Sequence, residues 1–505
     1  MKAKKLIYFL NSFFAGLLLL GVSVTHSGCK DEFTTDPAYR LSMPDSLLFD
    51  TILTQTLTPT ASFKIYNDTE EDIKIESILL QSEKNFFKIN INGQSGTSFS
   101  NVKIYAKDSM FIFVQFIADR SGSDEPLLIE DKIRFLYNGN AQEIVLSAYG
   151  QDVYHMRGKV HIQKDTTWSN DLPILVYDSV IVDSAATLTI KEGVTLYMKQ
   201  KGTFLVNGSL HVEGNAGKDV IFRTERMDNI SRNRTYDQAN NQWGGIYFSS
   251  SSKDNRIDHA FIRGGAFGLH IDSSEIVENE YRLIVANSHI HNTFNACLTA
   301  KNANVYAYNS LFTNGANGCV VLVRGYHQFD HCTISYHKAG SGYNNYALRL
   351  SNSNFVASSE TYPFKALFNN CIVTGYTSKY HTAGNGIYLV GDSLDYKFDH
   401  SLIFTDIPAT EIEQDEKHFN VVICNEDPQY VQVDMDQFSY DFHLKEESPC
   451  KEKGDLGLIL RNEAYQVDRD GVARMIEAAP DLGAYQIVIK EEEETEEAKS
   501  EPTDK

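Results

Sequence analysis

The chain has no excess of basic residues. Its 505 residues include 46 Lys and Arg against 67 Asp and Glu, and the formal net charge is -21. Nucleic-acid binding needs a basic surface that draws in phosphates, so this balance argues against a nucleic-acid partner. It also weighs against unaided binding of polyanionic glycans, although a bridging metal ion could reverse that effect.

Proline is also scarce, and cysteine motifs of zinc sites are absent. The chain has 11 Pro beside 32 Gly, 27 Tyr and 29 Phe, a composition that suits turns and β-structure better than helices. There are 7 Cys, but no CxxC motif and no Cys/His spacing of a zinc site. We therefore expect an all-β protein without structural zinc.

One short pattern returns six times between residues 257 and 403. It reads apolar, any, Asn or His, small, any, apolar, and the copies begin at 257, 285, 307, 329, 368 and 398, so they are 28, 22, 22, 39 and 30 residues apart. Such spacing indicates a solenoid. Asn and His enter the left-handed backbone region more readily than most residues, so each copy predicts a strand, a left-handed corner and a second strand. The six corner residues would stack as a structural ladder: His259, Asn287, Asn309, His331, Asn370 and His400.

A further strand follows each copy, with no helical period between strands, which predicts a parallel β-helix. Four cysteines fit its coils. Cys297 and Cys319 occupy equivalent places one coil apart, and Cys332 and Cys371 fill the small position of the pattern. We expect these four to be buried thiols that act as small apolar residues.

The first 28 residues are typical of a targeting segment. Lysines precede an apolar run over 6–24, and Ser-Gly stands before Cys29. This junction resembles a bacterial lipoprotein cleavage site, and Lys30, Asp31 and Glu32 resemble the acidic export signal of surface lipoproteins in the Bacteroidetes. The resemblance implies lipidation of Cys29 and an outer-membrane location, at the cell surface or, alternatively, facing the periplasm. An uncleaved membrane anchor is the other reading of the apolar run.

Residues 29–45 form a linker, and residues 46–153 alternate in short apolar runs with polar turns, which indicates a β-sandwich. The order of Tyr66-Asn67-Asp68, Ser109 before 111–116 and the closing 146–150 resembles the immunoglobulin-like domains related to the ASPM, SPD-2 and hydin family. That resemblance implies a spacer or docking module without chemistry of its own.

Residues 154–423 should form the β-helix. The run Trp243-Gly-Gly-Ile246, followed by the repeated coils, resembles right-handed parallel β-helix proteins of the pectin-lyase-like superfamily. The order of motifs in 424–487, among them 468–471 and 480–485, resembles their closing segment. Residues 488–505 are acidic and should be a disordered tail. The expected fold class is an all-β, right-handed parallel β-helix preceded by an immunoglobulin-like β-sandwich.

Known enzymes on this fold offer motifs that can be sought here. The Asp-Asp pair and Gly-His-Gly of the inverting hydrolases are absent. Arg263, Arg349 and Lys365 look isolated, so no lyase base beside Ca²⁺-holding carboxylates is evident. The three Asp-His phrases belong to the ladder, and the segment beginning at Asp468 fails as an EF-hand loop. We therefore assign no catalytic residue, no metal ligand and no cofactor, with Ca²⁺ left open.

Two groups of surface residues could bind a ligand. His289 and His291 alternate along one strand and could project outward as a metal pair, although a solvated surface pair is the simpler reading. Aromatic residues on two long loops could stack on sugar rings or pack the loops onto the coil. These aromatic residues are Tyr343, Tyr346, Tyr362, Tyr376 and Tyr380.

The expected function is non-catalytic. A cell-envelope lipoprotein would present the β-helix for adhesion, glycan binding or scaffolding, with the outer membrane, a polysaccharide or a surface protein as partner. The alternative is a polysaccharide lyase or glycoside hydrolase that acts on an extracellular polysaccharide.

Overall fold

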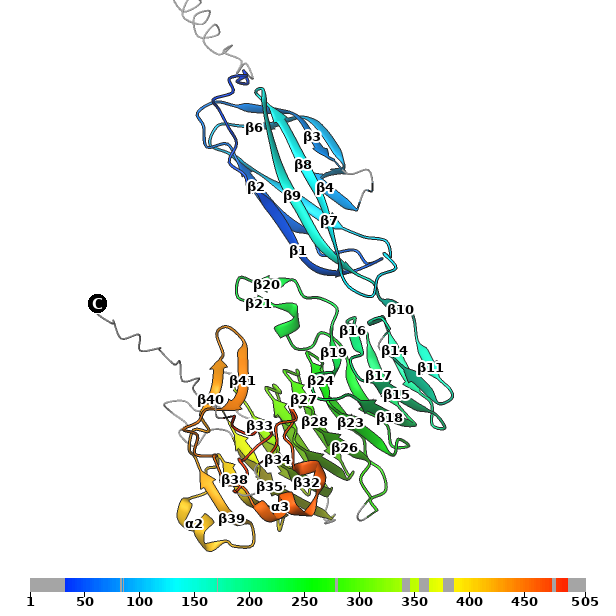
Figure 1. Ribbon diagram of the computed structural model, residues 1–505, viewed down its shortest axis with the longest axis vertical. Coiled ribbons are helices and arrows are strands. Elements are labelled where there is room, and N and C mark those ends of the chain that lie inside the picture. The colour runs from blue at the N-terminus through cyan, green and yellow to red at the C-terminus, as the bar shows by residue number, and fades with distance from the viewer. Residues whose placement is uncertain are drawn as a thin grey trace, which may run out of the picture. The chain divides into compact units, whose positions relative to one another are not determined.

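The computed structural model describes residues 32–81, 84, 86–169, 171–277, 280–337, 346–353, 363–375, 386–474 and 478–488. The chain divides into two compact units, 1–151 and 152–505 (Figure 1). Several residues singled out from the sequence lie outside the described residues. They are Cys29, Lys30, Asp31, Tyr343, Tyr362, Tyr376 and Tyr380.

The first unit is a β-sandwich. One sheet has the strand order β1-β9-β8-β3-β6 and the other β2-β7-β4-β5, and neighbours are antiparallel except β1 and β9. Inward side chains alternate with outward ones, and the inward set forms one apolar core. The strands are β1 (Ser46–Leu53), β2 (Ala61–Tyr66), β3 (Ile73–Leu80), β4 (Phe87–Ile91), β5 (Gln94–Gly96), β6 (Ser98–Ile104), β7 (Ser109–Phe116), β8 (Leu127–Tyr137) and β9 (Asn140–Gln151).

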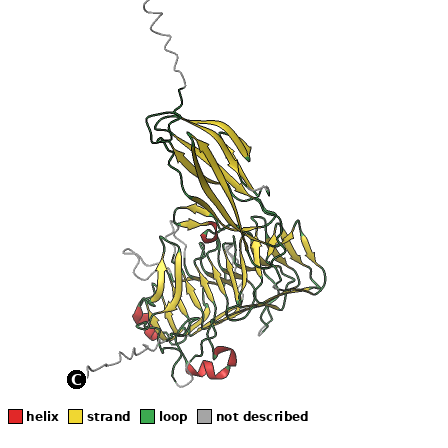
Figure 2. Ribbon diagram, turned by 45° about the horizontal axis from the view of Figure 1, so that its top comes forward, coloured by secondary structure: helices red, strands yellow, loops and turns green. Residues whose placement is uncertain are grey.

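The second unit is a parallel β-helix, so the expected fold class is confirmed (Figures 1 and 2). The larger sheet holds β10 (Tyr154–Met156), β12 (Thr166–Trp168), β13 (Ile174–Val176), β15 (Thr187–Lys191), β16 (Thr195–Met198), β18 (Ser209–Glu213), β19 (Val220–Thr224), β23 (Asn255–Asp258), β24 (Ala260–Arg263), β26 (Leu283–Ala286), β27 (His289–His291), β29 (Val305–Tyr308), β30 (Leu311–Thr313), β32 (Gly325–Asp330), β33 (Thr333–Ser335), β35 (Phe364–Asn369), β36 (Ile372–Thr374), β38 (Asp395–Ile403) and β39 (Phe419–Cys424). The smaller sheet holds β11 (Val160–Ile162), β14 (Ser179–Val182), β17 (Thr203–Val206), β22 (Gly245–Phe248), β25 (Leu269–Ile271), β28 (Leu298–Lys301), β31 (Val320–Val323), β34 (Leu348–Ser351) and β37 (Ile387–Val390).

The six sequence copies stack in register. Their first apolar residues, from Ile257 to Phe398, are direct partners in successive strands of the larger sheet. The strand that follows each of the first five copies belongs to the smaller sheet, whereas β39, which follows the sixth, belongs to the larger sheet. All six corner residues have positive φ, from 45° at His259 to 54° at Asn370. The corner therefore turns the chain once per coil between two runs of the larger sheet.

Apolar side chains fill the interior of the coils. Cys297, Cys319, Cys332 and Cys371 are free thiols with no exposed surface, and they lie in this core among the aliphatic residues. Phe329, Phe368 and Phe398 stack in successive coils, with ring centroids 5.2 and 4.7 Å apart. A continuous column of this kind is what a solenoid needs, because each coil buries its apolar face only against its neighbours.

The C-terminal segment closes the β-helix by bonding to the corners. Asn370 accepts a hydrogen bond from the Asp455 amide at 2.7 Å, and Asn309 donates to the carbonyls of Ala464 and Val467. Tyr465 donates to the buried Asp330 at 2.6 Å. The remaining elements are β20 (Asn229–Ser231), β21 (Arg234–Thr235), η1 (Tyr236–Gln238), α2 (Ala409–Gln414), β40 (Tyr430–Asp434), β41 (Ser439–Leu444), α3 (Leu456–Arg461) and η2 (Glu463–Tyr465).

Replacing Asn370 should separate the two ways in which a corner residue stabilises the fold, through its side-chain hydrogen bonds and through its left-handed backbone conformation. Asn370→Ala should lower the free energy of unfolding by about 3 kcal/mol, because it loses hydrogen bonds and forces alanine into the left-handed region. Asn370→Gly should recover about 1 kcal/mol of this, since glycine has no penalty there. Both Trp residues, Trp168 and Trp243, lie in the second unit, so tryptophan fluorescence in denaturant follows that unit alone. Equal losses in the two variants would refute the role given to φ.

Candidate functional site

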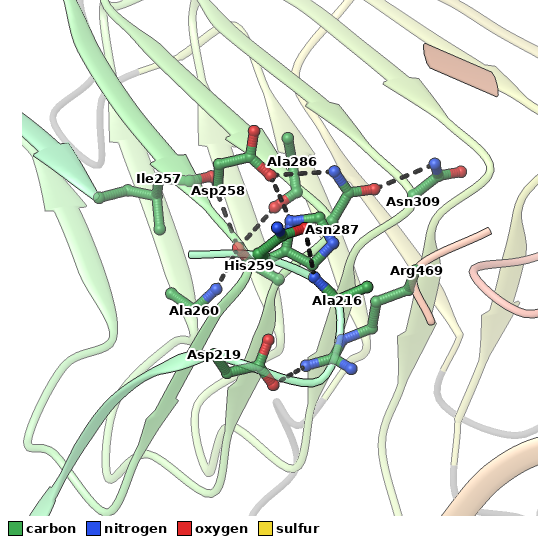
Figure 3. A network of polar contacts seen from close by, with 12 residues as sticks. Ala216, Asp219, Ile257, Asp258, His259, Ala260, Ala286, Asn287, Asn309 and Arg469 are labelled. Atoms are coloured by element: carbon green, nitrogen blue, oxygen red, sulfur yellow. Dashed lines mark hydrogen bonds and ion pairs between the residues drawn. The ribbon is translucent and has the colours of Figure 1, made fainter. Parts of the chain in front are cut away.

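The corner ladder is a network of polar contacts along one edge of the coils (Figure 3). Asp258 accepts hydrogen bonds from Asn287 at 2.9 Å and from Arg256 at 2.7 Å, and it also contacts the His259 Nδ1 at 2.8 Å. Asn309 donates in turn to Asn287 at 3.1 Å. Burial acts to raise the pKa of Asp258, but the hydrogen bonds from His259, Asn287 and Arg256 outweigh it, so the pKa is lowered.

The other Asp-His phrases are bonded in related ways. Asp399 contacts His400 Nδ1 at 2.7 Å and accepts from Asn420, while His331 Nε2 accepts from Asn370 at 3.0 Å. His331 has no exposed surface. His331 is therefore enclosed by the ladder and its cap, whereas His400, whose side chain is 26% exposed, is bonded along the ladder.

A cavity of about 680 Å³ lies on the outer face of the same sheet, next to the corner strands. It is lined by Thr235, Asp237, Gln238, Phe261, Arg263, His289, His291, Asn292, Asn314, His337, Met435, Asp436, Phe438, Ser439 and Tyr440. Its volume lies within the range usual for small-ligand sites. We call it the histidine pocket.

The floor of the histidine pocket follows from strand register. Phe261 pairs with His289 and Arg263 pairs with His291 across β24 and β27, so four outward side chains form a square. The two rings of Phe261 and His289 stack at 5.1 Å, and the Arg263 guanidinium lies 4.8 Å from the Phe261 ring. Alternate residues of these strands, such as Ile262 and Ile290, point into the core and fix the floor.

Thr313, on the next coil, joins the two histidines. Its hydroxyl lies 2.7 Å from both His289 Nε2 and His291 Nδ1. Burial, aided by the nearby His291, Arg469 and Arg263, holds the pKa of His289 well below its usual value. Burial likewise lowers the pKa of His337 to about 4. His289 and His337 are therefore neutral at pH 7 and can each donate and accept a hydrogen bond.

Arg263 shares a carboxylate with a second arginine. Asp237 lies 2.6 Å from Arg263 Nη2 through one oxygen and 2.9 Å from Arg223 Nη2 through the other. Burial lowers the pKa of Arg263 to about 10, so it stays charged at neutral pH. The Trp243 indole donates to the Arg263 carbonyl at 2.8 Å and fixes the backbone beneath the pair. Two cations therefore face one anion at this place.

Two segments far apart in the sequence wall the histidine pocket. One is the insertion 225–241, which carries η1, and the other is the β40–β41 hairpin. Gln238 donates over 3.4 Å to the carbonyls of Gln437 and Phe438, and Arg234 lies 4.6 Å from the Phe438 ring. Tyr440 extends the aromatic wall, with its ring 5.5 Å from His291.

The structure changes the reading of several residues. His289 and His291 lie together as the sequence suggested, but inside a pocket and bonded to Thr313. Arg263 is not isolated, because Asp237 of the insertion pairs with it. Arg349 lies 5.6 Å from the Tyr388 ring, on which Tyr346 stacks at 4.4 Å, so these residues form a separate cluster on the smaller sheet.

Asp237, His337 and Tyr440 were not identified from the sequence. Each stands outside any motif, and only the coil register and the fold of the insertion and hairpin bring them together. Within the described residues, no group of three His, Cys, Asp or Glu side chains gathers as a metal site, and no helix is long and apolar enough to cross a membrane. Glu32, the described member of the export signal, is exposed.

No known protein family and no curated protein matches the chain. Among solved structures, the chain is similar to an ASH/PapD-like domain of human CEP192, at 10% identity over 25% of this chain and 96% of that chain, with a TM-score of 0.17. It is also similar to a family 123 glycoside hydrolase from Clostridium perfringens, at 6% identity over 22% of this chain, with a TM-score of 0.16. The secreted serine protease VesC of Vibrio cholerae gives 13% identity over 23% of this chain and a TM-score of 0.17. The chain spans about a quarter of the latter two proteins.

Proposed function

We propose that the protein is a glycan-binding lipoprotein of the cell envelope, and that the histidine pocket is its carbohydrate site. The observation that carries this is the composition of the pocket: neutral imidazoles and amides stand beside partly exposed aromatic rings. Sugars need this combination, because their hydroxyls both donate and accept hydrogen bonds while their C–H faces pack on rings. The proposed lipid anchor at Cys29 would hold the β-helix outside the cytoplasm, at the cell surface or facing the periplasm. Adhesion and scaffolding would follow from glycan capture.

A polysaccharide lyase is the second candidate, and one observation favours it. The histidine pocket places the neutral His289 close to the charged Arg263. β-Elimination needs a base that removes a proton next to a carboxylate and a cation that stabilises the charge that develops. Unsaturated products released from uronic-acid polysaccharides would establish this candidate.

Retention on a panel of neutral and acidic polysaccharides, with and without Ca²⁺, tests the proposal directly. For the glycan that is retained, Tyr440→Ala should weaken binding about 10-fold, because it removes one aromatic wall. Affinity would be measured by titration of the purified chain. Tyr388→Ala is the matched control, since Tyr388 is 37% exposed and stacks on Tyr346 in the other cluster. If Tyr388→Ala weakens binding and Tyr440→Ala does not, the site is not the histidine pocket.

A further inference from the structure

We propose that Arg263 and Arg223 form a subsite for the anionic group of an acidic sugar, a carboxylate or a sulfate ester, and that Asp237 is an internal competitor that occupies this subsite in the free protein. The inference rests on the proposed function for the sugar, but the anion site itself can be tested without one.

The contacts of Asp237 are those expected of a bound anion. Its Oδ2 lies 2.6 Å from Arg263 Nη2, and its Oδ1 lies 2.9 Å from Arg223 Nη2 as an ion pair without a hydrogen bond. Planar guanidinium groups bind carboxylates and sulfates in the same way, through several N–H donors at once. Asp237 therefore occupies the position in which a ligand's anionic group would sit.

The arginine pair keeps binding capacity that Asp237 does not use. Among the described residues, the Nε atoms of Arg223 and Arg263 are buried and make no hydrogen bond. One carboxylate also leaves one of the two positive charges without a counterion in this pair, and buried charges without partners are costly. A ligand with a negative group would supply both the missing acceptors and the missing charge.

In this proposal the ligand reaches the arginine pair through the histidine pocket. Arg263 and Asp237 line the histidine pocket, whereas Arg223 is not part of the lining. The ring of the sugar would lie over Phe261 with its hydroxyls near His289 and His291. Its anionic group would then reach Arg263 first, and it would reach Arg223 only after the Asp237 carboxylate moved aside.

The attachment of Asp237 makes such a movement feasible. Asp237 belongs to the short η1 element in the insertion 225–241, and that insertion meets the β40–β41 hairpin through the 3.4 Å contacts of Gln238. Asn292 donates to the Gln238 carbonyl at 2.7 Å and would hold the insertion beside the pocket while the carboxylate turned away. The alternative is that Asp237 is only a structural ion pair that ties the insertion to β19 and β24.

The test compares Asp237→Asn and Arg263→Gln with the unaltered chain. The probes are an acidic oligosaccharide bearing carboxylates, a sulfated one, an uncharged one of equal length, and inorganic sulfate alone. Binding is followed by calorimetry and by the fluorescence of Trp243, whose indole donates to the Arg263 backbone. Asp228→Asn is the matched control, because Asp228 pairs with Arg226 in the same insertion and does not line the pocket.

We expect Asp237→Asn to bind the acidic probes roughly 5- to 10-fold more tightly, since the internal competitor loses its charge, and Arg263→Gln to bind them at least 10-fold more weakly. In each variant the change in affinity for the uncharged probe should be smaller than the change for the acidic probes, because only the acidic probes carry the anionic group. Inorganic sulfate should follow the acidic sugars if the anionic group alone is recognised. The inference is overturned if Asp237→Asn binds acidic probes no better than the control does. Binding of uncharged sugars would then still support the proposed function, whereas no binding of any sugar by any variant would overturn both.

Discussion

Replacing Arg474 by methionine should lower the free energy of unfolding of the β-helix by about 3 to 5 kcal/mol. Arg474 has only 1% of its surface exposed, and its Nη2 donates to the Asn309 side chain at 3.2 Å and to the Gly483 carbonyl at 3.1 Å. Two buried carboxylates, Asp468 and Asp481, depend on its charge. Burial raises the pKa of each, and the positive charge of Arg474 acts in the opposite direction. Methionine would leave two acceptors without a donor and both carboxylates without a countercharge.

The loss should be concentrated in the closing segment, because Arg474 joins that segment to the corner ladder. Amide hydrogen exchange of residues 445–474 should speed up before the coils at 160–260 change, and tryptophan fluorescence in denaturant should give the overall loss. Arg461→Met is the control: its side chain is 72% exposed, so its effect should stay within about 0.5 kcal/mol. Unchanged exchange in the closing segment together with a loss below about 1 kcal/mol would show that Arg474 does not latch it.

The coil register could be predicted from the sequence because its causes are local. A left-handed corner restricts which residues stand there, and the alternation of apolar residues fixes which side chains point inward. Ile257 and its five equivalents are therefore partners in the structure, in the order and at the spacings in which they occur in the chain. The long insertions before 364 and 395 do not disturb this pairing.

The histidine pocket could not be predicted in the same way. Its floor follows from register, so the outward pair His289 and His291 was recognisable. Its walls come from an insertion near residue 237 and a hairpin near residue 440, which no repeat relates to the coils. Arg263 looked isolated for this reason, because its partner Asp237 lies in the insertion 225–241, whose path depends on tertiary contacts.

Acidification from pH 7 to pH 4.5 should lower the free energy of unfolding by roughly 5 kcal/mol, because buried histidines stay neutral in the folded protein. Burial lowers the pKa of His327 and of His337 to about 4, and holds those of His289 and His331 well below the usual value. Below about pH 6.5 these histidines become protonated in the unfolded chain but stay neutral in the folded protein. The free energy of unfolding therefore falls by about 1.4 kcal/mol per pH unit for each histidine. Their contribution is complete above pH 6.5 and is lost as the pH falls toward the folded pKa.

Carboxylates modify this curve in two ways. Asp330, Asp468 and Asp481 have pKa values raised chiefly by burial, so the protein regains some stability as they protonate on acidification. Hydrogen bonds outweigh burial at Asp258 and Asp399 and lower their pKa values, so the stability that these two supply is lost only below about pH 4. The loss of unfolding free energy between pH 6.5 and pH 4.5 therefore comes mainly from the histidines. The expected 5 kcal/mol is smaller than the sum over four histidines because protonation of Asp330, Asp468 and Asp481 offsets part of that sum.

A variant of His327 measures the contribution of a single buried histidine to this pH dependence. His327 is 3% exposed, and its Nε2 lies 2.8 Å from the Arg324 carbonyl. His327→Leu should make the dependence of unfolding free energy on pH shallower by about 1.4 kcal/mol per unit between pH 6.5 and pH 4.5. Phe364→Leu alters the ring that contacts His327 at 5.9 Å, so it should lower stability at every pH and keep the slope of the unaltered protein. Parallel curves for His327→Leu and the unaltered protein would mean that His327 takes up its proton while folded, and that the coil interior opens to water before it unfolds.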